Sequence, residues 1–424
     1  MSESGVKQRS YTALAYLGIY TLLAGDSIRY LVGWVGFGVV AGVIALSTFA
    51  ALLIRRTSWR VIPPLLAALL TLMGLSIIWS NYPGFSALAL LSQLATTAYG
   101  VFLATHFTWH RLLKLLANTV RFILGLSLVF ELIAAVIVQG PIAPIFKNYT
   151  GDTPPTGAFY WTQAHLLTGL RIQGIVGNSN ILAFVAMLGL FLFAIEFLNR
   201  SVERRTATAS LAVAALMLAL AKSAGIGFAI LAVAIVVTVA WLVKGKNRDE
   251  RHRLYRFAWT GAGVIAFFVL LYRAEVFQFI GKSPDMSGRA GIWQSVLGLI
   301  QLRPIQGWGW ISYWVPGLVP YENLAVVNGV PYYQSHNAYL DVWLQLGIFG
   351  VLILVAMLTV TFIRLWRMAV RSNDLAQLWP LLIFVGLLIQ NLTESRLLLE
   401  SGWALLVLLT VKARISPIYE LNRD

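Results

Sequence analysis

Long apolar stretches recur along this chain and restrict what it can fold into. Twelve of them approach the roughly 20 residues that a helix needs to cross the hydrocarbon core of a membrane. A helix suits that setting because its backbone N–H and C=O groups are satisfied within the segment. The chain is 58% hydrophobic and 12% charged, against about 25% charged in soluble proteins. We therefore expect an all-α polytopic membrane protein with about 12 spans, at residues 11–26, 31–54, 61–79, 86–105, 115–138, 176–198, 207–221, 224–243, 255–272, 338–363, 376–393 and 398–412.

The basic residues indicate how the chain is oriented, because Lys and Arg accumulate in cytoplasmic loops. With both termini inside, 22 of the 32 Lys and Arg residues fall in inner segments, nine in outer segments, and Arg121 within a span. The net charge of +15 thus reports mainly topology, and we expect no nucleic-acid partner. Lys222 and the small residues up to Gly225 favour a hairpin over one long helix between the seventh and eighth stretches. The chain has no cysteine, which excludes disulfides.

Two expected outer segments are long, 139–175 and 273–337, whereas every expected inner segment is short. This asymmetry favours an enzyme or receptor that works on the outer side. In the second segment, apolar residues at helical spacing predict a short amphipathic helix on the membrane surface, from Arg289 to a stop at Pro304. The aromatic residues after it either settle at the headgroup level or stack on sugars, and we favour the headgroup level for any single ring. They are Trp308, Trp310, Tyr313, Trp314, Tyr321, Tyr332 and Tyr333.

Two histidines fall in the expected outer segments, His165 and His336. His336 lies in a polar cluster directly before the stretch 338–363. It is either an interfacial histidine at a helix start, with Asn337 as the helix cap, or a proton acceptor in a reaction. The sequence pattern alone leaves both interpretations open.

Four outer cations lie in contexts that favour anion binding, namely Arg171, Lys222, Arg289 and Arg396. Each alone is typical of a loop charge or of a side chain that extends to the interface. Together they form a set that is able to bracket a phosphate diester or a pyrophosphate. The outer carboxylates are widely scattered, with no Asp-x-Asp pair, no Walker loop and no dinucleotide fingerprint. We therefore expect no metal ion and no nucleotide cofactor.

Four sequence blocks carry a resemblance to a known family. They are RIQGIVGNSN (171–180), AKSAG (221–225), SGRAGIW (287–293) followed by RPIQGWG (303–309), and SHNAYLDVWLQLGIFG (335–350). In their order and topology these blocks resemble the O-antigen ligase and polymerase superfamily of bacterial envelope glycosyltransferases. Lys222 departs from the family pattern, which usually has arginine there. A lysine keeps the charge but loses the bidentate fork of a guanidinium.

The resemblance implies a metal-independent glycosyltransferase with a membrane-embedded fold of the GT-C type. Such an enzyme transfers a polysaccharide from undecaprenyl pyrophosphate to a sugar hydroxyl of lipid A-core, at the periplasmic side of the bacterial inner membrane and with inversion. In size and number of expected spans the chain is most similar to the ligases. A polymerase, which uses the same donor but a second lipid-linked glycan as acceptor, remains the nearest alternative. A transporter of lipid-linked glycans is disfavoured, because charges within the spans are few, with Glu131 the clearest.

Each candidate residue receives an expected role in this reaction. His336 is the general base that accepts the proton of the attacking hydroxyl. Arg289, Lys222 and Arg171, in that order, bind the donor pyrophosphate and stabilise it as it leaves. Four further residues orient the histidine or bind sugar, namely Asn180, Asn337, Tyr339 and Glu394. The lipid tail of the donor is expected to enter sideways between the spans, from the surrounding membrane lipid.

Overall fold

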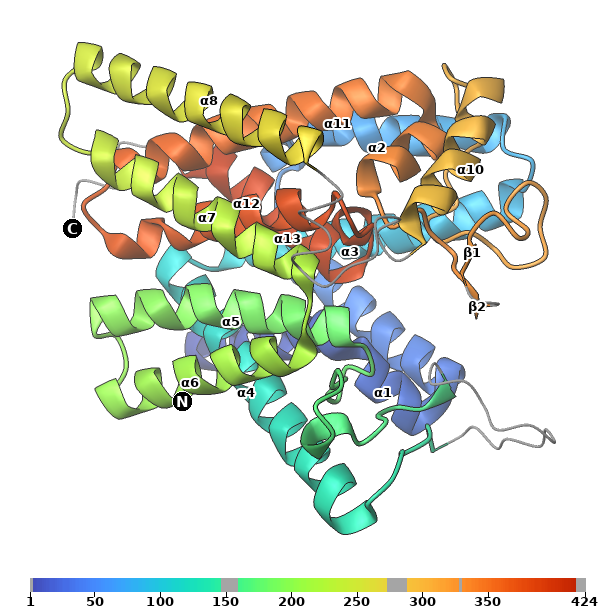
Figure 1. The fold of residues 1–424 in the computed structure, drawn as a ribbon, viewed down its shortest axis with the longest axis horizontal. Helices are drawn as coiled ribbons and strands as arrows, with labels where there is room; N and C mark the ends of the chain where they lie inside the picture. The colour runs from blue at the N-terminus through green and yellow to red at the C-terminus, as the bar shows by residue number, and fades with distance from the viewer. Residues whose placement is uncertain (1–2, 146–158, 273–287, 328–329, 417–424) are drawn as a thin grey trace.

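The structure is a computed structural model of the chain, and it describes residues 3–145, 159–272, 288–327 and 330–416. These residues are almost entirely helical, and among them there is one short hairpin of strands β1 (Val326–Val327) and β2 (Val330–Pro331). Short 3-10 turns and one π-helical segment (Ile133–Val138) connect or extend the helices. The helices, drawn in Figure 1, are α1 (Glu3–Ile54), α2 (Pro64–Leu75), α3 (Pro83–His106), α4 (Trp109–Leu132), α5 (Ser179–Asn199), α6 (Arg204–Ala221), α7 (Ala224–Val243), α8 (Arg248–Leu271), α10 (Arg289–Leu302), α11 (Ala338–Arg371), α12 (Trp379–Gln390) and α13 (Glu400–Ile415).

Each of the twelve expected spans coincides with a helix, but the first two share one. Residues 11–26 and 31–54 are the two arms of α1, which is kinked at Ala24 and Gly33. In the described part of the chain, seven helices are long and apolar enough to cross a membrane, namely α1, α3, α4 with its π-helical end, α5, α6, α7 and α11. The protein is therefore a multi-pass membrane protein by the length and composition of its helices. The number of twelve spans stays a prediction.

The helices that pack at the centre are apolar on all sides. From Ser401 through Val411 every residue of α13 is buried, as expected of a helix that is hydrophobic all round and surrounded by protein. It runs along α3, where a Cβ on Gly100 would lie 2.8 Å from Val407. A hydrogen bond of 2.8 Å from Trp403 Nε1 to Thr97 Oγ1 joins the same two helices. Helix α13 is thus fixed in the core of the protein, and the connection that leads into it from α12 ends there.

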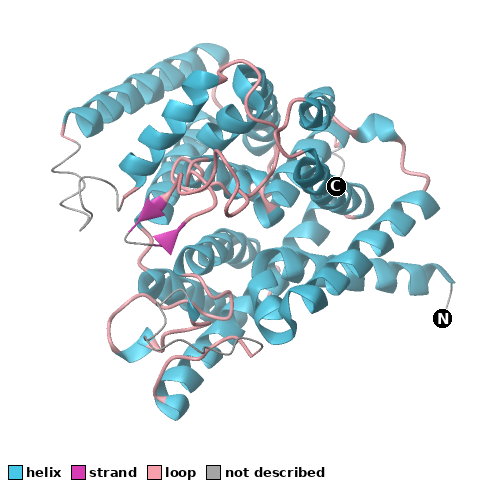
Figure 2. Cartoon of the chain, turned by 90° about the vertical axis from the view of Figure 1, so that its right-hand side faces the viewer, coloured by secondary structure: helices cyan, strands magenta, loops and turns pink. Residues whose placement is uncertain are grey.

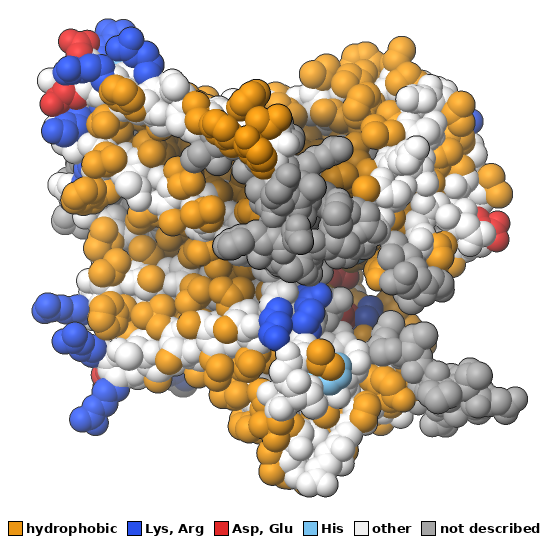
Figure 3. All heavy atoms as spheres, in the orientation of Figure 1, with side chains coloured by type: hydrophobic (Ala, Val, Ile, Leu, Met, Phe, Trp, Pro, Cys, Tyr) orange, Lys and Arg blue, Asp and Glu red, His pale blue; other side chains and the backbone are white. Residues whose placement is uncertain are grey.

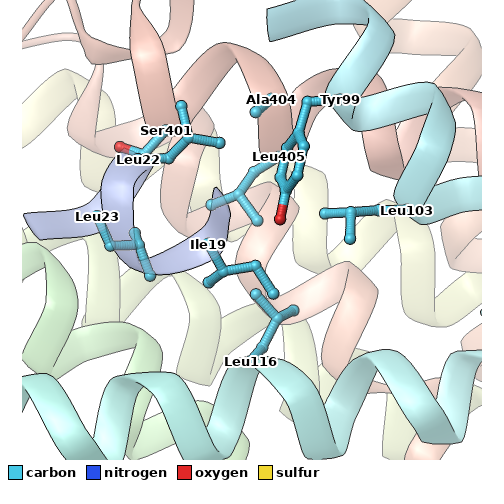
Figure 4. Close-up of a pocket in the computed structure, with 9 residues that line it drawn as sticks. All are labelled: Ile19, Leu22, Leu23, Tyr99, Leu103, Leu116, Ser401, Ala404 and Leu405. Carbon is cyan, nitrogen blue, oxygen red and sulfur yellow. The ribbon is translucent and has the colours of Figure 1, made fainter. Parts of the chain in front are cut away.

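Packing between α1, α3, α4 and α13 leaves one small hollow of about 20 Å³. Figure 4 shows Ile19, Leu103, Leu116 and Leu405 around the ring of Tyr99. The phenol oxygen of Tyr99 donates a hydrogen bond of 2.6 Å to the Ala15 carbonyl. Because the lining is apolar and little larger than one water, we interpret the hollow as a packing gap of the core.

Basic side chains gather at one end of the helices. In Figure 3 Lys and Arg cluster at the left-hand side, over the connections α5–α6 and α7–α8, while hydrophobic side chains cover the flanks of the helices. This separation of charged ends from apolar flanks is typical of helices that lie across a bilayer. We call the end that carries these two connections, residues 200–203 and 244–247, the basic end of the protein.

The opposite end carries the loops, as Figure 2 shows from that side, with β1–β2 among them. These loops include most of the segments 139–175 and 273–337, although residues 146–158, 273–287 and 328–329 lie outside the described residues. The helix predicted from Arg289 is confirmed as α10 and ends at Leu302, two residues before Pro304. Its buried residues Ile292, Val296 and Ile300 pack on the loop that follows it and on α11.

The structure corrects the expectation for three of the aromatic rings in this loop. Trp310, Trp314 and Tyr321 are buried inside the protein. Trp314 and Tyr321 stack at 6.2 Å between ring centroids and belong to the apolar cluster formed with α10. These rings therefore fold the loop, and they neither face lipid headgroups nor offer a surface to a sugar. Tyr313, Tyr332 and Tyr333 are exposed.

Candidate active site

One buried carboxylate, that of Glu394, joins most of the candidate residues. Its Oε1 accepts a hydrogen bond of 2.9 Å from Arg289 Nη2 and another of 2.9 Å from Asn180 Nδ2. Its Oε2 lies 3.2 Å from His336 Nδ1. The three partners come from the starts of α10, α5 and α11, so that segments far apart in the sequence meet at the connection between α12 and α13. We call these four residues the Glu394 cluster.

The turn that carries His336 is fixed from both sides. His336 has a φ of 53°, in the left-handed region that few residues other than glycine adopt. Before it, the backbone N–H of Ser335 donates to the Asp341 carboxylate at 3.2 Å, and Ser395 also donates to that carboxylate. After it, Asn337 caps α11. The ring of Tyr332 packs edge-on at 5.0 Å between ring centroids. The imidazole is therefore held in one place.

Asn337 and Tyr339 use their polar groups on the backbone. Asn337 Oδ1 accepts from the N–H groups of Tyr339 and Leu340 at 3.0 and 3.1 Å, which confirms the predicted helix cap. Its amide nitrogen donates to the Leu392 carbonyl at 3.2 Å. Tyr339 Oη donates to the Leu388 carbonyl at 2.9 Å. Both residues thereby tie the start of α11 to the end of α12, and so position His336 beside Glu394.

Arg171 reaches the cluster through Asn180. Its Nη2 donates to Asn180 Oδ1 at 2.6 Å, and its Nε donates at 2.9 Å to the carbonyl of Ala221, the last residue of α6. The loop that carries Arg171 is held by Glu131 of α4. Oε1 of Glu131 accepts from the backbone N–H groups of Gln173 and Gly174 at 3.0 and 2.7 Å. Glu131, the charged residue that the sequence places within a span, therefore fixes the backbone of the loop that leads to the site.

Lys222 lies at the edge of the site. It ends α6 with a φ of 48°, and its exposed Nζ donates to the Gly169 carbonyl at 2.6 Å. Its neighbour Ser223 donates to Asn180 Oδ1 at 3.3 Å. Of the three cations assigned to the donor, Arg289 thus contacts Glu394 directly, Arg171 contacts it through Asn180, and Lys222 is a neighbour of that pair.

The surrounding charges keep Glu394 ionised. Burial raises the pKa of a carboxyl, but the hydrogen bond and charge of His336 and the charges of Arg289 and Arg396 outweigh it, so that the pKa of Glu394 lies below its usual value. For Arg171, burial lowers the pKa, the charge of Glu394 raises it, and that of Arg289 lowers it further, with a net decrease. A guanidinium nevertheless stays protonated in proteins.

An ionised Glu394 determines the hydrogen-bonding role of His336. Because a carboxylate only accepts, the contact between Nδ1 and Oε2 places the proton on Nδ1 of the histidine. Nε2 of a neutral His336 is then an acceptor, which is the form that a general base requires. The tautomer is inferred from this hydrogen bond.

Two guanidinium nitrogens at the site are buried without an acceptor. Among the described residues, neither Nε of Arg289 nor Nε of Arg396 has a hydrogen-bond partner. Arg396 lies two residues after Glu394, and its guanidinium packs over the ring of Phe184 at 5.3 Å. Buried donors are normally paired, so each unpaired donor requires an explanation. An anionic ligand at this place would supply the missing acceptors.

Comparison with known proteins agrees with the resemblance seen in the sequence. A family model described as O-antigen ligase matches residues 177–355. This part of the chain is thus similar to the O-antigen ligase family. The match includes Asn180, Lys222, Arg289 and His336, whereas Glu394 lies beyond its end.

One curated protein is similar to a part of the chain. The exopolysaccharide production protein ExoQ of Rhizobium meliloti (strain 1021) is 25% identical to this chain over 134 residues, which cover 30% of the chain and 31% of that protein. The similarity thus spans less than a third of the relative's length. Both comparisons are therefore with proteins named for polysaccharides, an O-antigen ligase family and an exopolysaccharide production protein.

Two residues that fix the site received no role from the sequence pattern. Asp341 and Ser395 join the turn at His336 to the connection that carries Glu394, with Ser395 donating to the Asp341 carboxylate. Asp341 lies in the polar cluster around His336, which is a detectable signal, but its partner is 54 residues away. Among the described residues, no group of three or more His, Cys, Asp and Glu side chains is placed to hold a metal ion.

Proposed function

We propose that this protein is a glycosyltransferase that moves a glycan from a polyprenyl pyrophosphate to a sugar hydroxyl, with His336 as general base. The observation that carries the proposal is the Glu394 cluster, in which one carboxylate orients an imidazole and holds Arg289 beside it. The unpaired Nε atoms of Arg289 and Arg396 provide donors for a pyrophosphate. A proton acceptor and a set of cations are the two requirements of this reaction.

The reaction is a single displacement at the anomeric carbon of the donor sugar. The acceptor hydroxyl gives its proton to Nε2 of His336 while its oxygen bonds to that carbon. The bond from the carbon to the pyrophosphate oxygen breaks, and its electron pair leaves with the pyrophosphate. One displacement inverts the anomeric configuration. Glu394 stabilises the imidazolium that forms, as the carboxylate of a Ser-His-Asp triad does.

Charge stabilisation of the leaving group comes from the chain's own cations in this scheme. Pyrophosphate is a weak base and leaves without a proton, so that fixed positive charge is what lowers the barrier. Arg289 is the first candidate, and Arg171 and Lys222 extend the positive field. This assignment makes the transfer metal-independent and requires no cofactor.

Within this scheme, the specific function that we propose is that of an O-antigen ligase in the bacterial inner membrane. The donor is then O-antigen polysaccharide on undecaprenyl pyrophosphate, and the acceptor is a sugar of lipid A-core. The basic end of the helices supports cytoplasmic termini and a site that faces the periplasm, by the rule that Lys and Arg stay inside. A GT-C-type fold belongs to the same proposal.

A polymerase is the second candidate, because the similar protein ExoQ is named for exopolysaccharide production and its name does not refer to lipopolysaccharide. Its acceptor would be a second lipid-linked glycan instead of lipid A-core. Both functions use the same donor and the same base, so the Glu394 cluster serves either. The chemistry of the acceptor alone separates them.

Reconstitution with defined substrates tests both candidates. The purified protein in liposomes receives lipid-linked glycan with or without lipid A-core, in the presence of a chelator. Glycan on lipid A-core supports the ligase, and chain lengthening without lipid A-core supports the polymerase. Transfer that stops with chelator and returns with Mg²⁺ contradicts the cation-only scheme. Absence of transfer in every arm, with substrates that a known ligase and a known polymerase accept, contradicts the transferase proposal.

A further inference from the structure

A large basic hollow lies at the basic end of the protein, far from His336. Its volume is about 680 Å³. His336 lies two residues before α11 and the hollow contacts the last turns of this helix, so roughly 45 Å of helix separate the two places. The hollow is formed by the α7–α8 connection, the start of α8 and the end of α11. Its lining includes the cations Lys246, Arg248, Arg251, Arg367 and Arg371 and the imidazole of His252.

The inner wall of the hollow is a small packed interface. Ala240 and Val243 of α7 meet Val370 of α11 in an apolar cluster. At its edge Trp366 Nε1 lies 3.1 Å from Tyr255 Oη, and the two rings pack edge-on at 6.0 Å between centroids. Because Tyr255 belongs to α8 and Trp366 to α11, this contact ties the two helices together. The basic side chains therefore extend from helices that are held in a defined arrangement.

The positive charge of the hollow is only partly neutralised. Oε1 of Glu250 lies 3.6 Å from Nζ of Lys246. Glu250 also forms the capping box of α8 with Asn247. Among the described residues, Nε of Arg251 is buried and has no hydrogen-bond partner. A cation that serves only as a solvated loop charge has its N–H donors in water, whereas this donor is shielded from water and lacks an acceptor. The start of α8 adds the positive end of a helix dipole. The hollow therefore has the chemistry of an anion site.

The surroundings of the hollow are those of a membrane surface. Trp241 near the end of α7 is 74% exposed, and Phe257 and Trp259 on α8 are 76% and 77% exposed. Exposed tryptophans near the ends of apolar helices settle at the headgroup level of a bilayer. An anion at this depth that also has apolar chains is able to use both features. Its phosphate meets the guanidinium groups, and its chains lie along the exposed flanks of α7 and α8.

We propose that this hollow binds the phosphate headgroup of an anionic membrane phospholipid, at a site separate from the one that transfers glycan. Basic hollows between membrane helices are suited to such headgroups. The proposal does not depend on the transfer reaction, because it rests only on residues of the opposite end. It assigns a binding role to charges that orientation alone would otherwise explain.

Lipid binding to the purified protein tests the proposal. The full chain in a neutral detergent is titrated with phosphatidylglycerol, and bound lipid is counted by native mass spectrometry. The wild type is expected to retain phosphatidylglycerol in preference to zwitterionic phosphatidylcholine. The double variant Arg251→Gln/Arg367→Gln should bind it about tenfold to thirtyfold more weakly, since each cation near a membrane surface contributes about a factor of five. A parallel readout is the rise of the unfolding temperature with added lipid, which the variant should lose.

A matched variant separates a specific site from general attraction to positive charge. Arg204→Gln/Arg205→Gln removes two exposed cations from the start of α6, at the same basic end, and should bind lipid as the wild type does. Equal lipid binding by both double variants overturns the proposal. So does competition by soluble glycerol 3-phosphate at the concentration of the lipid, because the acyl chains then contribute nothing. If the first double variant does not fold, Arg251→Gln and Arg371→Gln are measured singly, and unchanged binding in both is equally contradictory.

Discussion

His336 and Glu394 are 58 residues apart in the chain, and Nδ1 of the first lies 3.2 Å from Oε2 of the second. The other oxygen of the same carboxylate accepts hydrogen bonds from Arg289 and Asn180. Rotation of this one side chain would therefore break three contacts at once. The orientation of the imidazole and the position of the arginine depend on each other, and this dependence gives the following predictions their direction.

Replacement of the base should separate binding from transfer. His336→Ala is expected to keep the affinity for lipid-linked donor within about twofold and to lower the transfer rate by about 10² to 10⁴, the usual contribution of a general base. Binding is measured by retention of labelled donor in liposomes, and transfer by gel mobility of the product. His110→Ala, at an exposed residue that pairs with Asp374, serves as the control. Native transfer by His336→Ala would show that the base is another group.

Neutralising Glu394 should affect His336 without removing any carbon atom. In Glu394→Gln the amide has no charge to stabilise an imidazolium, and its nitrogen is able to donate to Nδ1 and favour the wrong tautomer. We expect transfer to fall by about 10² or more. Glu322→Gln, at an exposed loop residue, should transfer normally. A Glu394→Gln protein that folds and transfers at the native rate would contradict the orienting role.

Arg289 should matter for donor binding and for the chemical step alike. Removing one preorganised donor from a developing negative charge costs about 10² or more in rate, and Arg289→Ala also removes a charge that the resting pyrophosphate uses. Arg289→Lys retains the charge but lacks the planar fork, and an intermediate loss is expected. Arg303→Ala, at the other end of α10, is the control. Unchanged donor affinity in Arg289→Ala would move the pyrophosphate to another set of cations.

The stability of the fold should depend on pH through Glu394. Its pKa in the folded protein lies below the usual 4.5, to which it returns on unfolding. Its ionisation therefore stabilises the fold above about pH 4.5, and this contribution is lost as the pH falls through the lower folded-state pKa. Unfolding temperatures in detergent between pH 7 and pH 3 measure it. Glu394→Gln should show a shallower acid decline than wild type, whereas Glu203→Gln, at an exposed residue, should follow wild type. Coincident curves for Glu394→Gln and wild type would contradict the charge assignment.

A break inside α11 provides a test of the fold. Gly347 has a φ of 66°, and a Cβ added there would lie 1.9 Å from the Ile305 carbonyl oxygen. We expect Gly347→Ala to lower the free energy of unfolding by about 2 kcal/mol or more, because strain and a clash with backbone add up. Gly298→Ala on α10, where a Cβ meets nothing within 4 Å, should be neutral or stabilising. Thermal unfolding compares the two, and equal midpoints would show that the break is not rigid.

Local patterns in the sequence predicted local features of the site. Asn337 is an N-cap because its amide oxygen satisfies free N–H groups of the first turn, and this depends on residues 337–340 alone. The helix from Arg289 was likewise readable from its apolar spacing. The same kind of reasoning separated residues 11–26 from 31–54, whereas the structure continues α1 through two kinks. A short polar interruption of an apolar stretch is compatible both with a kink inside one helix and with a loop between two helices.

The contacts of the site depend on tertiary packing that no spacing encodes. Asn180 and Glu394 are 214 residues apart, and Arg289 and Glu394 are 105 apart. Their contact follows from the packing of α5 against α12, of α10 against α11, and of α11 against α12 and α13. The same limit explains why the expectation for the aromatic residues after α10 was wrong for three of them. A Trp beside Pro and Gly has the same sequence pattern at a membrane surface as inside a folded loop. Burial of Trp310 and Trp314 was decided by their contacts with distant helices.

The break at Gly347 also separates two duties of α11. The N–H groups of Trp308 and Gly309 donate to the carbonyls of Leu344 and Gln345 at 2.9 Å each, so the short arm before Gly347 is attached to the outer loop. The long arm after it packs among the apolar helices. The histidine at the head of the short arm is thus positioned by the loop layer. Because Gly347 fits against the backbone of Ile305, and Ile348 just after it donates to the Pro304 carbonyl at 3.0 Å, a change of tilt in the long arm is expected to reach this loop layer and, through it, His336.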